Sequence, residues 1–175
     1  MSHNPRVLLL TGDGKGKTTA ALGMALRASG HDLRSCVIQF IKGDKSVGEI
    51  AAAQANGRID IIQCGLGFLP QPEAPQFAEH RAAAEAGWRT GCEILASGRY
   101  ALVVLDEICL AVSRGLLAEE QVCCGVGQVA PETCVVLTGR GATPGLIALA
   151  DTATEMVCLK HGLQAGIPAQ KGIEW

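Results

Sequence analysis

The chain has 175 residues, of which 48% are hydrophobic, and its 15 Lys and Arg against 17 Asp and Glu give a net charge of −2. This length favours one domain over residues 1–175, and the composition excludes a disordered chain. The charge argues against nucleic acid as a partner, and no run of ~18 apolar residues suggests a membrane span. The N-terminus lacks the pattern of an export signal, so we expect a cytoplasmic location.

Short apolar runs alternate with helical patterns along the chain. The predicted strands lie at 7–11, 35–41, 59–63, 100–105, 133–138 and 155–159. Predicted helices cover 18–29, 47–55, 76–96 and 146–150, with two shorter helices between the strands at 100–105 and 133–138. A loop at 65–75 contains three prolines, which exclude a continuing helix or a central strand. The alternation predicts an α/β fold, a single-domain three-layer sandwich with a mostly parallel sheet.

Polar residues follow the predicted strands at the point where each strand ends. Because the carboxyl ends of parallel strands share one edge of the sheet, and ligands bind at that edge, we expect these residues to surround one crevice. They are residues 11–17, Lys42, the 65–75 loop, Asp106 with Glu107, Gly139 with Arg140, and Lys160 with His161.

A glycine-rich loop lies between the first predicted strand and the first predicted helix. Its sequence at 11–19, TGDGKGKTT, fits the phosphate-binding pattern G-x-x-x-x-G-K-[ST], except that Thr11 stands at the first position. In such a loop backbone amides converge on phosphate oxygens, Lys17 supplies a positive charge and the Thr18 hydroxyl can ligate Mg²⁺. The strand before it and the helix after it disfavour a merely flexible turn. The predicted nucleotide ligands are Gly12, Asp13, Gly14, Lys15, Gly16, Lys17, Thr18 and Thr19.

A second candidate motif is the apolar strand at 101–105, which ends in Asp106 and Glu107. Such carboxylates can hold Mg²⁺ directly or through water. Alone, the pair reads equally well as a solvated turn or a helix N-cap. Together with the phosphate loop it indicates a Mg-nucleotide site. These two motifs leave open a generic P-loop phosphotransferase or ATPase, and also a nucleotide-binding module without catalysis.

The chain resembles the P-loop ATP:corrinoid adenosyltransferases from about Arg6 onward. The resemblance rests on the order and spacing of the phosphate loop, including its Thr-first form, and of several further short motifs. They are QFIKG at 39–43 with Gly48 and Glu49, Gly67 with Phe68, LDE at 105–107, LTGRG at 137–141, Ala150 with Asp151, TEM at 154–156, Lys160 with His161, Gly166 with Ile167, and AQKGIEW at 169–175.

The resemblance implies a P-loop NTPase-like fold and a specific reaction. A Co(I) corrinoid attacks the 5′-carbon of ATP, a cobalt–carbon bond forms and triphosphate leaves; the nucleotide lies across the loop in the direction opposite to that in ATP hydrolases. Co(I) is already a strong nucleophile, so no Ser-His or Cys-His pair is required. The step needs a stabilised polyanionic leaving group and correct positioning.

The resemblance also assigns residues and partners. For this reaction Lys17 and Glu107 are the expected catalytic residues, Thr18, Asp106 and Glu107 are expected to hold Mg²⁺ or Mn²⁺, and Arg27 is a further expected ATP contact. The resemblance implies that Phe68 packs on the corrinoid where its lower axial ligand would sit. The substrates are ATP and cob(I)alamin or cobyrinic acid diamide. A flavin-type reductase supplies electrons, and the protein is a homodimer with no nucleic-acid or membrane partner.

The sequence departs from the family pattern in two places. Many members have Phe-Thr-Trp in the corrinoid loop, whereas this chain has Phe68, Leu69 and Pro70 and lacks the second aromatic. Many members also carry an N-terminal extension that covers the partner's active site, whereas the first strand is expected here by about Arg6. The alternative reading of Phe68 is a buried core residue, as phenylalanine usually is.

Overall fold

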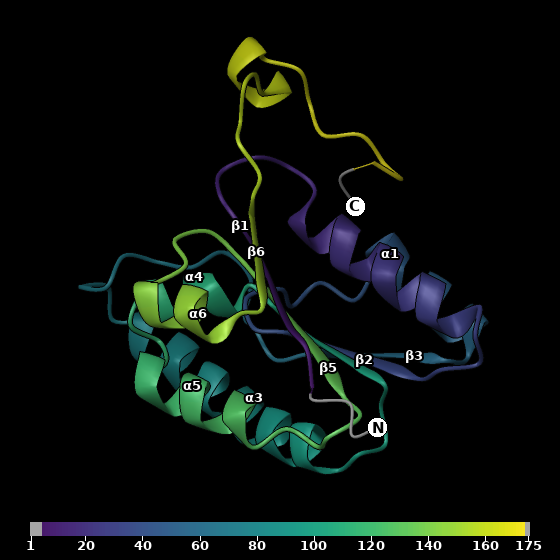
Figure 1. Ribbon diagram of the computed structural model, residues 1–175. Helices are drawn as coiled ribbons and strands as arrows, with labels where there is room; N and C mark the ends of the chain where they lie inside the picture. Colours follow the sequence, from purple (N-terminus) through teal and green to yellow (C-terminus); the bar gives the residue numbers. More distant parts are fainter. Residues whose placement is uncertain (1–4, 174–175) are drawn as a thin grey trace.

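Six strands form one sheet in which every neighbouring pair runs parallel, and the computed structural model describes residues 5–173 of the chain (Figure 1). The spatial order is β3-β2-β4-β5-β1-β6. The first five strands confirm the predicted ones to within two residues. Their bounds are β1 (Val7–Thr11), β2 (Ser35–Gln39), β3 (Ile59–Gln63), β4 (Leu102–Asp106), β5 (Cys134–Thr138) and β6 (Thr152–Glu155).

Alternate side chains of the central strands enter two separate apolar cores. Val103 and Leu105 of β4 face one core, whereas Leu102 and Val104 face the other. This follows from the two-residue period of a strand, and it explains why these runs are apolar throughout instead of alternating with polar residues.

Helices cover both faces of the sheet and complete the three predicted layers (Figure 1). Ala21 and Ala25 pack α1 on one face, and Asn56 at the end of α2 donates to Ser29 Oγ at 3.1 Å on the same side. The remaining helices pack on the opposite face, where Trp88 and Val122 are buried. The helices are α1 (Lys17–Ser29), α2 (Gly48–Asn56), α3 (Phe77–Ala96), α4 (Ile108–Ser113), α5 (Glu119–Gly127) and α6 (Pro144–Leu149), and η1 (Gly162–Ala165) is a 3-10 turn. None of the helices within residues 5–173 is long and apolar enough to cross a membrane.

The last predicted strand, at 155–159, is wrong in its position. The observed β6 ends at Glu155, and Val157 and Leu159 are 65% and 94% exposed. The reason lies in the partner strand: β1 ends at Thr11, and the last backbone hydrogen bonds are Met156 N–H to Thr11 O at 2.8 Å and, from the phosphate loop, Gly14 N–H to Met156 O at 2.6 Å. The apolar run at 156–159 therefore leaves the sheet, and the chain extends away before it returns toward the start of α1 (Figure 1).

The register of the sheet brings polar residues together at its carboxyl edge. Gln39 of β2 pairs with Asp106 of β4, and Thr138 of β5 pairs with Leu10, one residue before the end of β1. Gln39, Asp106 and Thr138 are each the last residue of their strand and follow a run of apolar residues. The carboxyl ends of the strands therefore form the floor of the crevice that the sequence predicts.

Candidate functional site

The loop between β1 and α1 has a conformation that depends on glycine. Gly16, directly before α1, has φ +115°, a region that other residues rarely occupy. At Gly14 a Cβ atom would lie 2.6 Å from the carbonyl oxygen of Met156, and the Gly14 N–H donates to that oxygen. The loop is therefore shaped by its own glycines and by the chain just after β6.

Lys17 folds back into this loop. Its Nζ donates to the carbonyl oxygens of Gly12 and Gly14, both at 2.7 Å, and the residue is 7% exposed. Burial lowers the pKa of Lys17, against the opposing effect of the nearby Glu107 carboxylate. The ammonium group is thus enclosed by the loop whose amides face a phosphate in P-loop proteins.

Asp106 is the centre of a buried hydrogen-bond network behind the loop. The residue is fully buried, its Oδ1 accepts from Thr18 Oγ1 at 2.8 Å and from Thr138 Oγ1 at 2.7 Å, and its Oδ2 accepts from Gln39 Nε2 at 3.2 Å. The sequence analysis includes Gln39 and Thr138 in the motifs that carry the resemblance but gives neither of them a role. The sequence did carry a hint of this role, because each is a polar residue at the end of a buried strand, where packing alone would favour an apolar residue.

Glu107 is held in an unusual backbone conformation beside Asp106. Its φ is +62°, which is rare for a residue other than glycine, and its N–H donates to Thr138 Oγ1 at 2.9 Å. The Oε2 atom is buried without a hydrogen-bond partner, and burial followed by the Asp106 charge raises the pKa of the carboxyl group. Backbone strain together with an unpartnered buried oxygen is typical of a functional residue.

The donor set near the loop suits one particular class of metal ion. Within residues 5–173 no three His, Cys, Asp or Glu side chains cluster as a metal site of their own. Mg²⁺ does not need such a cluster, since it takes one or two carboxylates, water and substrate phosphates. Thr18, Asp106 and Glu107 supply oxygen donors of this kind, and the unpartnered Oε2 of Glu107 fits a cation ligand.

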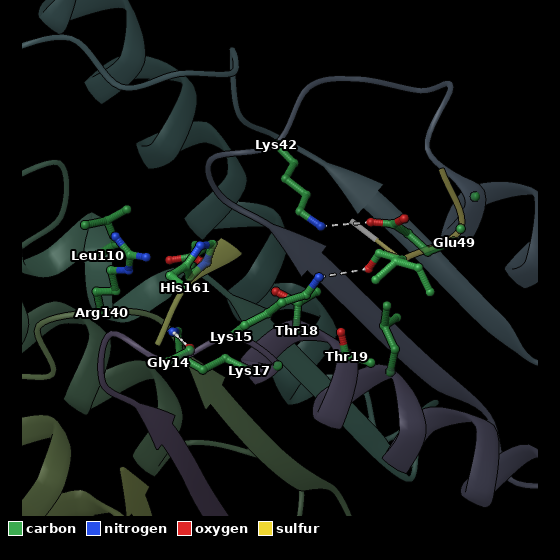
Figure 2. A pocket seen from close by; sticks show the side chains of 16 residues that line it. Gly14, Lys15, Lys17, Thr18, Thr19, Lys42, Glu49, Leu110, Arg140 and His161 are labelled. Atoms are coloured by element: carbon green, nitrogen blue, oxygen red, sulfur yellow. Dashed lines mark hydrogen bonds and ion pairs between the residues drawn. The ribbon is translucent and has the colours of Figure 1, made fainter. Parts of the chain in front are cut away.

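A pocket of about 610 Å³ opens above the loop (Figure 2). Arg140 and His161 lie on one side of it, where Arg140 Nε is 3.6 Å from Asp13 Oδ1 and His161 Nδ1 accepts from Leu163 N–H at 3.2 Å. The pocket is lined by Gly14, Lys15, Gly16, Lys17, Thr18, Thr19, Leu22, Lys42, Gly48, Glu49, Glu107, Leu110, Arg140, His161, Gly172 and Ile173. The size suits a nucleotide-sized ligand.

An ion pair occupies the other side of the same pocket. Lys42 Nζ lies 2.8 Å from Glu49 Oε1, and Figure 2 shows the two side chains pointing toward each other above Thr18 and Thr19. Burial would raise the pKa of Glu49, but the hydrogen bond and the charge of Lys42 act against it and the net pKa is lowered. The sequence placed Lys42 at the crevice but gave neither residue a role.

Two predicted site residues lie away from this pocket. Arg27 is exposed in the last turn of α1, about 15 Å along the helix from Lys17 at 1.5 Å per residue, and does not line the pocket. Phe68 is 98% exposed in the loop after β3, so its reading as a core residue is wrong. Of the closing motif, Glu174 and Trp175 lie outside the described residues.

Comparisons with known proteins give one consistent result. The family model described as "ATP:corrinoid adenosyltransferase BtuR/CobO/CobP" matches residues 3–175. A corrinoid adenosyltransferase of Pseudomonas aeruginosa is 41% identical over 170 residues, which are 97% of this chain and 83% of the relative. Corrinoid adenosyltransferase CobA of Salmonella typhimurium is 36% identical, and a corrinoid adenosyltransferase of Escherichia coli K12 is 34% identical; each match covers 97% of this chain and 85% of the relative.

Proposed function

Because the chain belongs to the ATP:corrinoid adenosyltransferase family, and is an enzyme that transfers the adenosyl group of ATP to a corrinoid, we propose that the phosphate-loop pocket is its active site. The observation that carries this assignment is the convergence of Lys17, Thr18 and Glu107 on one nucleotide-sized pocket. A generic phosphotransferase or ATPase is not favoured, since the matched relatives are named corrinoid adenosyltransferases and each match covers 97% of this chain.

The phosphate loop stabilises the leaving group in this proposal. When Co(I) attacks the 5′-carbon, the C5′–O bond breaks with its electron pair and negative charge grows on the departing triphosphate. The amides of residues 12–18 and the enclosed ammonium group of Lys17 face that charge from fixed positions, which is the arrangement that lowers a barrier most. Lys17 exchanges its two backbone carbonyl acceptors, on Gly12 and Gly14, for phosphate oxygens when ATP binds.

A Mg²⁺ ion would be held by Thr18 with Asp106 and Glu107. When bound, it would neutralise part of the triphosphate charge and orient the chain of phosphates. Asp106 orients the Thr18 hydroxyl through the 2.8 Å hydrogen bond, while Gln39 and Thr138 fix Asp106. Among these three metal-ligand candidates, only Glu107 has a buried side-chain oxygen without a hydrogen-bond partner in the protein.

Phe68 is proposed as the contact to the corrinoid. Its exposed ring stands in the loop after β3, at the carboxyl edge that also carries the phosphate loop. An aromatic ring in the place of the lower axial ligand favours reduction of Co(II) to Co(I), because an axial donor stabilises Co(II) more than Co(I). Pro70 stands where many relatives have a second aromatic, so Phe68 performs this role alone here.

We also propose the wider setting that the resemblance implies. The corrinoid is cob(I)alamin or cobyrinic acid diamide, a flavin-type reductase delivers the electron, and the enzyme works as a homodimer in the cytoplasm. The low net charge and the absence of a spanning helix within residues 5–173 raise no conflict with this setting.

The direct test is product analysis. The protein is incubated with Mg-ATP and cob(II)alamin under a strong chemical reductant. We expect tripolyphosphate and adenosylcorrinoid in equal amounts, with the same incubation without corrinoid as the control. Release of ADP or orthophosphate without an organometallic product would contradict the proposal.

A further inference from the structure

The strand ends lie in an order that matches the parts of the substrates. The phosphate loop follows β1, Asp106 and Glu107 end β4, Lys42 follows β2, and Phe68 follows β3, while the sheet order places β2 between β4 and β3. If the proposed function holds, the 5′-carbon of ATP lies between the triphosphate and the cobalt. The ribose that carries this carbon is therefore next to the carboxyl end of β2.

The side chains present at that end are Lys42 and Glu49, and they are firmly positioned. Their ion pair is 2.8 Å long, and the Glu49 side chain is only 16% exposed. Gln39 Nε2 donates to Asp106 Oδ2 at 3.2 Å, and Asp106 Oδ1 accepts from Thr18 Oγ1 at 2.8 Å. A hydrogen-bond network therefore runs from the phosphate loop to Gln39 at the end of β2, and Thr18, Lys42 and Glu49 line the same pocket.

We propose that Glu49 accepts hydrogen bonds from the 2′- and 3′-hydroxyls of the ATP ribose and so fixes the direction of the 5′-carbon. An ionised carboxylate only accepts hydrogen bonds, and a ribose diol offers two neighbouring donors. Carboxylates recognise ribose hydroxyls in this way at other nucleotide sites on parallel sheets. The inference rests on the proposed function, since it assumes that the nucleotide extends from β1 toward β3.

Lys42 acts as a positioning residue in this arrangement. A carboxylate beside the triphosphate would repel it, and the ammonium group of Lys42 offsets that charge while it holds one oxygen of Glu49. The hydrogen bond and the charge of Lys42 also keep the pKa of Glu49 low in spite of burial, so the group remains an acceptor at neutral pH.

The experiment compares ATP with 2′,3′-dideoxy-ATP, which keeps the 5′-carbon and the triphosphate but lacks both donors. With pre-reduced Co(I) corrinoid, we expect the wild type to lose about 10- to 100-fold in kcat/KM with dideoxy-ATP, as for hydrogen bonds to a charged group. Glu49→Ala and Glu49→Gln should each lose activity with ATP, and Glu49→Ala should use the two nucleotides almost equally. Inhibition by tripolyphosphate should stay unchanged in both variants.

The outcomes separate this inference from the proposed function. If Glu49→Ala and Glu49→Gln both retain the wild-type preference for ATP, or if the wild type uses both nucleotides equally, the ribose assignment is overturned while adenosyl transfer stands. If the wild type yields no adenosylcorrinoid from ATP at all, the proposed function itself fails. Glu85→Gln, at an exposed position on α3, is the matched control and should keep both activity and preference.

Discussion

The two ends of the proposed active site differ in how far their side chains are buried and hydrogen-bonded before the substrates bind. At the phosphate end, Lys17 and Asp106 are buried, and they make two and three hydrogen bonds, respectively, within the protein. At the corrinoid end, Phe68 and its neighbour Leu66 are exposed to solvent. The loop that carries them is tied to the protein by contacts such as Gly67 N–H to Ile41 O at 2.9 Å.

This difference follows the chemistry that each end has to perform. Charge that develops on a leaving triphosphate is stabilised best by dipoles that are already in place, so the phosphate end is rigid and buried. A corrinoid is a large and partly apolar partner, and an exposed ring can bury its surface only when that partner arrives. Substitutions at the two ends should therefore impair the activity of the enzyme in different ways.

The largest effect is expected at Lys17. Lys17→Ala removes the only side-chain ammonium enclosed by the phosphate loop among the described residues, so we expect adenosyl transfer from either Co(II) or Co(I) to fall by about 10³-fold or more. Initial rates of adenosylcorrinoid formation measure this. Lys45→Ala, an exposed residue outside the pocket, is the control, and a Lys17→Ala rate equal to that control would remove Lys17 from catalysis.

A smaller loss of activity, but a real loss of stability, is expected at Asp106. Asp106→Asn turns an amide toward Gln39 Nε2, so a donor faces a donor, and it removes the charge behind Thr18. We expect about a 10²-fold loss of activity and a lower free energy of unfolding by about 1–3 kcal/mol. Urea unfolding compared with Asp32→Asn, an exposed aspartate, checks the second effect. Unchanged stability would mean that the network around Asp106 is not energetically important.

At the corrinoid end the effect should depend on the starting oxidation state. Phe68→Ala is expected to reduce the rate from Co(II) by about 10-fold or more, and to leave the rate from pre-reduced Co(I) nearly unchanged. Because the ring is exposed, the free energy of unfolding should stay within about 0.5 kcal/mol of the wild type. Leu66→Ala, in the same loop, is the matched control. Equal losses from both states would exclude the lower-ligand role.

The same contrast explains what the sequence could predict. The phosphate loop and the apolar strand before Asp106 are local patterns with a period or a fixed spacing, and the structure places them as predicted. The partners of Asp106 could not be named from one sequence, because Gln39 and Thr138 meet it only through the strand order and register. Long-range pairing of this kind leaves no local signal beyond an isolated polar residue.

The errors also have physical causes. The run at 156–159 has the composition of a strand, but a strand needs a partner and β1 has already ended at Thr11. Arg27, expected as a further triphosphate contact, stays a prediction: it lies in the last turn of α1 and does not line the pocket. Lys42 and Glu49 are seven residues apart in sequence with a turn between them, so their ion pair had no helical spacing to reveal it.

The smallest effect is expected where the two ends meet, at the Lys42–Glu49 pair. The pKa of Glu49 in the folded protein lies below its ordinary value of 4.5. The pair therefore stabilises the fold at pH values above 4.5, and this contribution is lost as the pH falls through the folded pKa. Because Lys42 is 35% exposed, screening by solvent limits the contribution to about 0.5–1 kcal/mol.

Urea unfolding of the wild type and Glu49→Gln at several pH values measures this contribution. We expect a constant difference in the free energy of unfolding above about pH 5.5, where a carboxylate of ordinary pKa is ionised in both states. The difference should shrink as the pH is lowered below 4.5, the ordinary pKa of Glu49. A difference that grows toward low pH would have the wrong sign for a carboxylate of lowered pKa. Such a result would mean that Lys42 does not hold Glu49 as an ionised carboxylate in the folded protein.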